Sequence, residues 1–151
     1  MKTGRIECGR IASWLLTASG VWLVGLGAYF IALRPPLLPE DPRFIGTSLD
    51  RLRQSAPGLE SWLQIVFTVM GGYMLGAGIL TVFVARVAMP RRLPGTGWVL
   101  ALAGLSTVAL MSAMNFVLHS DFRWVLVVPV AIWTAGVAAF VARDSSRPST
   151  E

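Results

Sequence analysis

Polar side chains that could carry out chemistry gather at the end of one apolar stretch of the sequence. Ser112, Asn115 and His119 are spaced by three and four residues, so they share one face if this stretch is helical. Asp121 follows two residues later. His119 is the only histidine in the chain, and an imidazole next to a carboxylate can exchange a proton near neutral pH.

A second apolar stretch carries Gln64 and Thr68, which we expect at a similar depth in the outer half of a membrane. One interpretation is an outer-leaflet polar cluster of Gln64, Asn115 and His119 that binds or transports a small apolar or lipidic ligand. In the other, Gln64 and Asn115 donate hydrogen bonds between helices, worth about 1 kcal/mol each. His119 is then a residue of the membrane interface. We prefer the second interpretation.

Charged residues after the first apolar stretch form another candidate site. Glu40, Asp41 and Arg43 could together bind a cation or a partner protein. Solvated charges in a loop explain the same three residues with fewer assumptions, and we prefer that explanation.

Missing residue types exclude several classes of membrane enzyme and transporter. Di-haem four-helix proteins need pairs of histidines and thiol–quinone oxidoreductases need paired cysteines, whereas this chain has one His and one Cys, Cys8. Metal sites need three or four clustered ligands, and small proton-coupled exporters need a carboxylate within a span. The apolar stretches provide neither, and there is no phosphate-binding loop, nucleophile elbow or HExxH motif. We therefore predict no enzymatic activity and no cofactor.

The elements that must position these residues are predicted to be four transmembrane helices. Hydrophobic residues make up 54% of the 151 residues and charged residues 14%, with a mean hydropathy of +0.63; soluble domains carry about 25% charged residues. Four stretches without an ionised side chain would be about 28–36 Å long as helices, enough to cross a hydrocarbon core of about 30 Å. They cover residues 11–33, 62–85, 96–118 and 124–142. The fold class is therefore all-α, a four-transmembrane-helix bundle that makes residues 1–151 a single membrane domain.

Lys and Arg residues at the ends of these stretches predict the orientation, because cytoplasmic segments are enriched in them. Eight of the 13 lie in the N-terminus, the second loop and the tail, and five lie in the first and third loops. Three acidic residues on the first side and five on the second leave net charges of +5 and zero. Both termini are therefore predicted to be cytoplasmic.

The first loop, residues 34–61, is the one large segment predicted outside the membrane, with 28 residues on the outer side. Prolines interrupt its beginning, whereas residues 47–54 are predicted to form a short helix with Thr47 or Ser48 as its N-cap. The polar tail, residues 144–151, is predicted to be disordered.

Small residues predict where the helices pack, because they let another helix approach closely. They recur every four positions in the second and fourth spans, as Thr68, Gly72 and Gly76, and as Ala131, Ala135 and Ala139. We prefer packing within the chain to a contact between two copies. Pro129 lies inside the fourth predicted span and predicts a kink there.

Two segments of the sequence resemble a group of small bacterial four-span proteins without assigned function. The segments run from Arg34-Pro35-Pro36-Leu37-Leu38-Pro39-Glu40-Asp41 through Phe44-Ile45-Gly46, and over Val69-Met70-Gly71-Gly72-Tyr73-Met74. The resemblance extends over about a third of the chain. The resemblance implies the same topology and a location in the bacterial inner membrane, and it implies no activity.

These patterns favour a small non-enzymatic membrane protein, an accessory, assembly or scaffolding component. Its expected partners are the lipid bilayer and either another membrane protein or a second copy of itself. The net charge of +5 does not indicate nucleic-acid binding, because the basic residues flank the predicted spans and form no aromatic-interleaved stripe. The alternative is the ligand-binding or transport protein described above.

Overall fold

The computed structural model describes the backbone of residues 2–145 and the side chains of residues 9–142. These residues form helices joined by turns, with no strand among them, which confirms the all-α fold class. The helices are α1 (Lys2–Ala32), α2 (Glu40–Ile45), α3 (Leu49–Ser55), α4 (Leu59–Phe83), α5 (Met89–Arg91), α6 (Thr96–Gly104), α7 (Leu110–Val117) and α8 (Val127–Ser145). Two π-helical turns, η1 (Val84–Ala88) and η2 (Leu105–Ala109), join α4 to α5 and α6 to α7.

Three continuous helices are long and apolar enough to cross a membrane: Gly9–Ala32, Leu59–Arg91 and Thr96–Val117. They cover the first three predicted spans, and they identify the chain as a membrane protein. The fourth apolar helix, Val127–Ala142, is shorter than these three.

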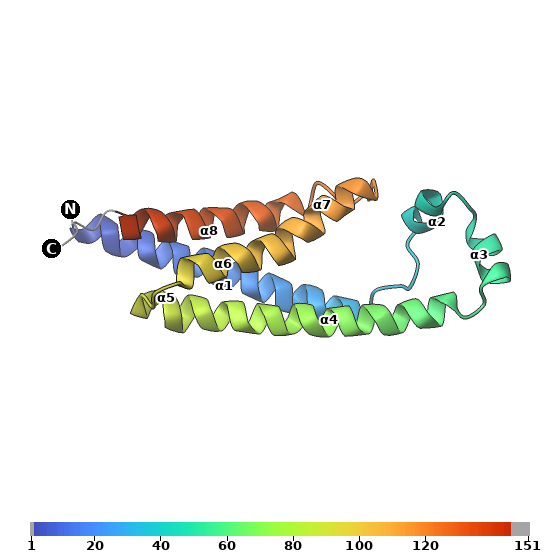
Figure 1. Ribbon diagram of the computed structural model, residues 1–151, viewed down its shortest axis with the longest axis horizontal. Coiled ribbons are helices and arrows are strands. Elements are labelled where there is room, and N and C mark those ends of the chain that lie inside the picture. The colour runs from blue at the N-terminus through green and yellow to red at the C-terminus, as the bar shows by residue number, and fades with distance from the viewer. Residues whose placement is uncertain (1, 146–151) are drawn as a thin grey trace.

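The helices form two antiparallel pairs that meet along α1 and α8 (Figure 1). In one pair α4 packs along α1, and in the other α6 and η2 pack on α8. The start of α1 and the end of α8 lie at the same end of the bundle, whereas α2 and α3 lie beyond the opposite end (Figure 1). We call these the terminal end and the loop end. The tail was predicted to be disordered from residue 144, but residues 144 and 145 continue helix α8, which corrects the start of the tail. Residues 146–151 lie outside the described residues.

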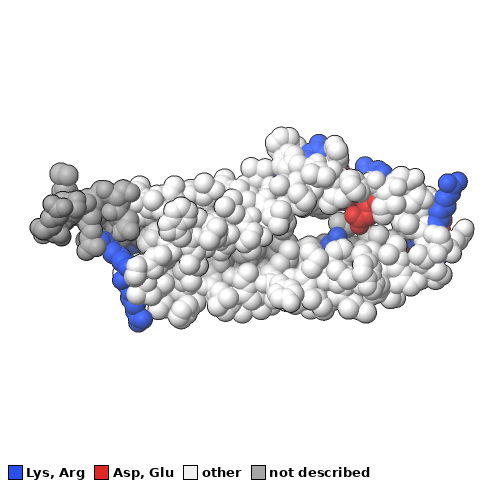
Figure 2. Space-filling model, viewed as in Figure 1, with Lys and Arg blue, Asp and Glu red and all other residues white. Residues whose placement is uncertain are grey.

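The surface between the two ends is uncharged in the view of Figure 2, where charged side chains appear only near the ends. Large apolar side chains along this band are widely exposed, such as Leu80 at 65% and Leu105 at 64%. The buried core is small by comparison, and its largest fully buried side chains are Leu16, Leu23, Leu100 and Val108. Exposed apolar area on this scale is typical of a surface that faces lipid.

Glycines spaced by seven residues bring α1 and α4 into contact. A Cβ on Gly78 would lie 2.6 Å from the carbonyl oxygen of Gly20, and a Cβ on Gly71 would lie 2.7 Å from that of Gly27. Carbon atoms cannot come so close to an oxygen, so the two backbones approach to a distance that only glycine allows. The seven-residue repeat keeps this contact on one side of each helix.

The small-residue row predicted on α4 is not part of this contact. A Cβ on Gly72 or Gly76 would meet no atom within 4 Å, and Thr68 is exposed. Gly71 and Gly72 point about 100° apart on a helix, so only one of them can face α1. The prediction that Thr68, Gly72 and Gly76 pack within the chain is therefore wrong, and their contact with a second chain stays a prediction.

On α8 the packing residues are Trp133 and Gly136. Trp133 is only 3% exposed, and its Nε1 donates a hydrogen bond to the Leu100 carbonyl oxygen at 2.9 Å. Gly104 leaves room for this ring, because a Cβ there would lie 2.6 Å from Trp133 Cδ1. A Cβ on Gly136 would likewise lie 2.8 Å from Cγ of Leu16 on α1.

Of the three alanines predicted to pack on α8, only the last one, Ala139, contacts the buried core. Ala131 and Ala135 are exposed.

Helix α8 begins at Val127, three residues later than the predicted span, so Pro129 falls in its first turn. A proline there breaks no helical hydrogen bond, which corrects the predicted kink.

The segment between α1 and α4 holds two short helices where one was predicted. Ser48 caps α3 as expected, with Oγ accepting a hydrogen bond from the Arg51 backbone N–H at 3.3 Å. Helix α2 was not predicted because of its prolines. Pro39 stands at its N-cap and Pro42 in its first turn, two positions that tolerate the missing N–H.

Candidate functional site

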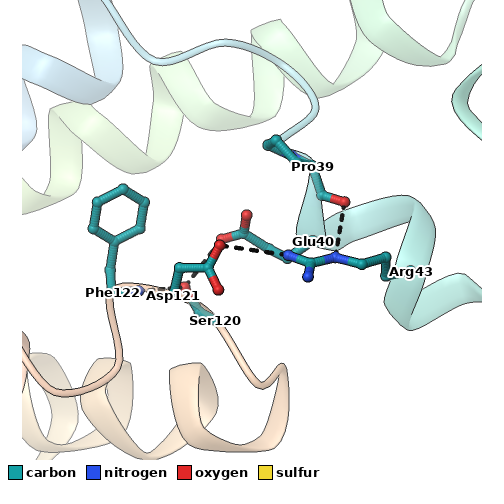
Figure 3. A network of polar contacts seen from close by, with 6 residues as sticks. All are labelled: Pro39, Glu40, Arg43, Ser120, Asp121 and Phe122. Carbon is teal, nitrogen blue, oxygen red and sulfur yellow. Dashed lines mark hydrogen bonds and ion pairs between the residues drawn. The ribbon is translucent and has the colours of Figure 1, made fainter.

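A buried carboxylate links α2 to the turn between α7 and α8 at the loop end (Figure 3). Ser120 Oγ donates a hydrogen bond to Glu40 Oε1 at 3.0 Å. The two residues are only 2% and 6% exposed, respectively. Ser120 Oγ also accepts a hydrogen bond from the Phe122 backbone N–H at 3.2 Å. The serine hydroxyl therefore connects the carboxylate with the start of the turn that leads into α8.

An exposed ion pair accompanies this buried contact. The guanidinium of Arg43 lies 3.5 Å from Asp121 Oδ2, with side chains 63% and 72% exposed. Arg43 Nε also donates to the carbonyl oxygen of Pro39 at 3.3 Å. Exposed ion pairs contribute little to stability, about 0–1 kcal/mol. The buried Glu40–Ser120 hydrogen bond is therefore the stronger link.

The local sequence explains why Glu40 points inward. Pro39 ends the extended segment and starts α2, so that Glu40 lies in the first turn of the helix. Asp41 Oδ2 accepts a hydrogen bond from the Leu38 backbone N–H at 2.7 Å, which fixes the chain before the helix. The interpretation of Glu40 as a solvated loop charge is therefore wrong, whereas Arg43 is solvated as expected.

Arg34 is a further charged residue at the loop end, and no pattern in the sequence predicted its contacts. Its guanidinium carbon lies 3.4 Å from the centre of the Phe67 ring and 5.1 Å from that of Phe30. This cation–π contact connects the ends of α1 and α4. Partial burial lowers the pKa of Arg34 from its usual value, and the nearby Asp41 carboxylate opposes the shift.

The predicted face of Ser112, Asn115 and His119 does not form, because α7 ends at Val117. His119 has φ 51°, and its N–H donates to the Phe116 carbonyl while that of Ser120 donates to the Asn115 carbonyl. This pattern is a Schellman motif, in which His119 takes the left-handed position that glycine usually fills. His119 is exposed, and its main contribution is the termination of α7.

The two amide side chains predicted to meet lie on different helices that do not pack together. Asn115 Nδ2 donates to the Met111 carbonyl of its own helix at 2.9 Å, so it is not an interhelical donor. Gln64 lies on α4, whose packing partner is α1, while α7 rises away from α4 in Figure 1. The structure therefore does not bring Gln64, Asn115 and His119 into one cluster.

Gln64 instead lines an open groove on the surface of α4. The groove is formed by one face of the helix at its loop end together with Pro36 after α1. Thr68, one turn further, donates its hydroxyl hydrogen to the Gln64 backbone carbonyl at 2.8 Å. The Gln64 amide forms no hydrogen bond with the described residues, so this groove offers a donor and an acceptor to an external molecule.

The π-helical turn η2 is a further polar feature that the sequence analysis missed. A π turn disrupts the regular ladder of backbone hydrogen bonds, which in lipid must be compensated. Ser106 Oγ donates to the Leu102 carbonyl at 2.9 Å, and the Thr107 hydroxyl donates to the Ala103 carbonyl at 2.5 Å. The adjacent Gly104, Ser106 and Thr107 are a compositional signal for such a distortion.

The loop end thus holds the buried hydrogen bond between Glu40 and Ser120, which we call the latch, Arg34 on two aromatic rings, and the open groove at Gln64. Among the described side chains, no group of three or more His, Cys, Asp and Glu could hold a metal ion. Comparison of the chain with protein-family models, with curated proteins and with solved structures gives no match.

Proposed function

We propose that the chain is a four-span protein of the bacterial inner membrane that serves as a non-enzymatic accessory, assembly or scaffolding component. Its partner is another membrane protein or a second copy of the chain. Different features of the described residues support the topology and the assembly surface.

The packing of α8 supports a fourth crossing. Its apolar part, Val127–Ala142, is about 24 Å long at 1.5 Å per residue. This is shorter than a hydrocarbon core of about 30 Å, but local thinning of the bilayer accommodates such a mismatch. Helix α8 runs antiparallel along α1, and the end of α8 lies at the same end of the bundle as the start of α1 (Figure 1). A helix in this position lies within the same layer of the bilayer as α1.

The observation that carries the assembly role is a face of α4 left without a neighbour. Tyr73 on this face is 78% exposed, and its hydroxyl forms no hydrogen bond with the described residues. It stands about halfway along the uncharged stretch 62–85, where lipid tails provide no hydrogen-bond partner. Gly72 and Gly76 beside it leave open space. A partner helix would fill that space and could accept a hydrogen bond from the tyrosine.

Site-specific photo-crosslinking in native membranes tests this role. A photoreactive amino acid at position 73 is expected to form an adduct with a protein, either a second copy or a different membrane protein. The matched control is position 105, where Leu105 is 64% exposed in the middle of another span. Protein adducts from 73 but not from 105 support the proposal. Lipid adducts alone at both positions overturn it.

The groove at Gln64 supports a second candidate, the binding of a small apolar or lipidic ligand. Mass spectrometry of the protein captured in a mild detergent would then show a specific retained molecule. Gln64→Leu is expected to abolish its retention, and Asn115→Leu, which removes only an amide bonded within its own helix, is the control. Equal retention by both variants contradicts this candidate.

A further inference from the structure

Among the described side chains, those that carry charge at the terminal end are four arginines. Arg10 lies on α1, and Arg86, Arg91 and Arg92 lie on η1, α5 and the turn that follows. All four are exposed, and none forms an ion pair with a described residue. The described acidic side chains all lie elsewhere, in α2, α3, the start of α4 and the turn before α8. Figure 2 shows the basic side chains along this end of the surface.

One of these arginines is held in place by an aromatic ring. The guanidinium carbon of Arg86 lies 4.0 Å from the centre of the Trp14 ring. A ring covers one flat face of a guanidinium and leaves its N–H edge free, and that edge matches two oxygens of a phosphate. The edge of Arg86 donates to no described residue. Its donors are therefore oriented and available.

The end of α5 and the turn that follows it present two more arginines, Arg91 and Arg92, and the backbone at Arg92 is strained. Arg92 has φ 52°, and the N–H groups of Arg92 and Leu93 donate to the Met89 and Ala88 carbonyls. Glycine would fill this left-handed position with less strain, since other L-residues pay about 1 kcal/mol there. An arginine at this position keeps a positive side chain at the surface where the helix ends.

Aromatic rings place this basic end at the depth of lipid headgroups. Trp14 is 57% exposed and Trp98, at the start of α6, is 77% exposed. Exposed tryptophans at the ends of spans lie in the interfacial region of a bilayer. Basic side chains at that depth face the phosphate groups of the lipids.

We infer that this end of the bundle is a binding surface for anionic phospholipid headgroups, with Arg86 on Trp14 as its main contact. The lipid phosphate accepts hydrogen bonds from the Arg86 edge, and Arg10, Arg91 and Arg92 add charge around it. Zwitterionic lipids carry a compensating positive charge and gain less from this surface. The inference requires only that the chain lies in a membrane, and it is independent of any protein partner.

Native mass spectrometry of the full chain in a mild detergent tests it. The probes are phosphatidylglycerol and phosphatidylcholine with identical acyl chains, added separately. The wild type is expected to retain phosphatidylglycerol in preference, and Arg86→Gln is expected to lower that retention about five-fold. The matched control is Arg51→Gln, an exposed arginine on α3 at the loop end without an ion pair to a described residue. It should leave retention unchanged.

Equal retention of the two lipids by the wild type overturns the inference, as does an equal loss in the two variants. If Arg86→Gln does not yield folded protein, the salt dependence of lipid retention by the wild type tests the inference. Its preference for phosphatidylglycerol should then fall at high salt, because ions screen exposed charges. A preference that salt does not alter overturns the inference as well.

Discussion

Single glycine positions decide how closely the helices of this protein approach one another. Gly78 and Gly76 are two residues apart on α4, but only Gly78 faces another helix. A Cβ on Gly78 would lie 2.6 Å from the Gly20 backbone oxygen, whereas one on Gly76 would meet nothing within 4 Å. The difference arises because the two residues point about 200° apart around the helix.

We expect Gly78→Ala to destabilise the isolated protein by about 1–3 kcal/mol, since the helices must move apart to admit the methyl group. Gly76→Ala should leave stability unchanged or slightly raised, because alanine favours helix. Thermal unfolding of both variants in detergent, followed by circular dichroism, measures the two effects. Equal shifts of the unfolding midpoint would show that the close α1–α4 contact does not exist in the folded protein.

His119 likewise acts through its backbone conformation. It terminates α7 with φ 51°, a region that β-branched residues avoid. We expect His119→Val to lower stability by about 1 kcal/mol and His119→Gly to preserve or raise it. The same thermal measurement applies. If His119→Gly were as harmful as His119→Val, the imidazole side chain itself would contribute to stability, which contradicts a role through the backbone alone.

At the scale of elements, the latch between α2 and the α7–α8 turn ties the two helix pairs together at the loop end. Elsewhere at this end the pairs diverge, and Figure 2 shows an opening between them with acidic side chains at its rim. Glu40 and Ser120 are 80 residues apart in sequence, so their hydrogen bond closes a long loop. The latch therefore orders a segment that has few other contacts.

We expect Ser120→Ala to speed hydrogen exchange of the α2 backbone amides, because it leaves the buried Glu40 carboxylate without its partner. Loss of a hydrogen bond to a charged group is worth about 1.5–3 kcal/mol. Exchange in the middle of α4 should not change. Glu40→Gln retains an acceptor oxygen and should preserve protection, and Arg43→Gln at the exposed pair should have little effect. Unaltered α2 exchange in Ser120→Ala would mean that the latch is open in solution.

Sequence patterns predicted the long helices well and their contacts poorly, for physical reasons visible in particular residues. Apolar runs without charge marked three long helices, since lipid tolerates little else. Contacts depend on which face meets a neighbour. Gly71 and Gly72 are adjacent in sequence, and nothing local indicates which one faces α1. The seven-residue spacing of Gly20 with Gly27 and of Gly71 with Gly78 was the signal available.

The polar residues were misplaced for similar reasons. His119 left the predicted face because the helix ended two residues before it. Glu40 was interpreted as exposed because charges in a loop are usually solvated. Long-range partners such as Ser120 for Glu40, or the Phe67 ring for Arg34, depend on the tertiary arrangement of the loop. Local sequence does not report that arrangement.

At the scale of the whole molecule, charge is distributed between the two ends in a way that predicts orientation. The described acidic side chains lie at the loop end, whereas the terminal end carries Arg10, Arg86, Arg91 and Arg92. Segments rich in arginine remain in the cytoplasm during insertion. We therefore expect the loop end to face outward and the terminal end to face the cytoplasm.

Cysteine labelling in intact cells measures this orientation. In a Cys8→Ala background, Gln54→Cys on α3 should react with a membrane-impermeant maleimide, because that exposed residue faces outward. Leu93→Cys, 50% exposed in the turn after α5, should react only after the cells are permeabilised. The reverse pattern would invert the topology. Tags at the two termini then count the crossings, since four spans place both tags on the side of Leu93 and three spans separate them.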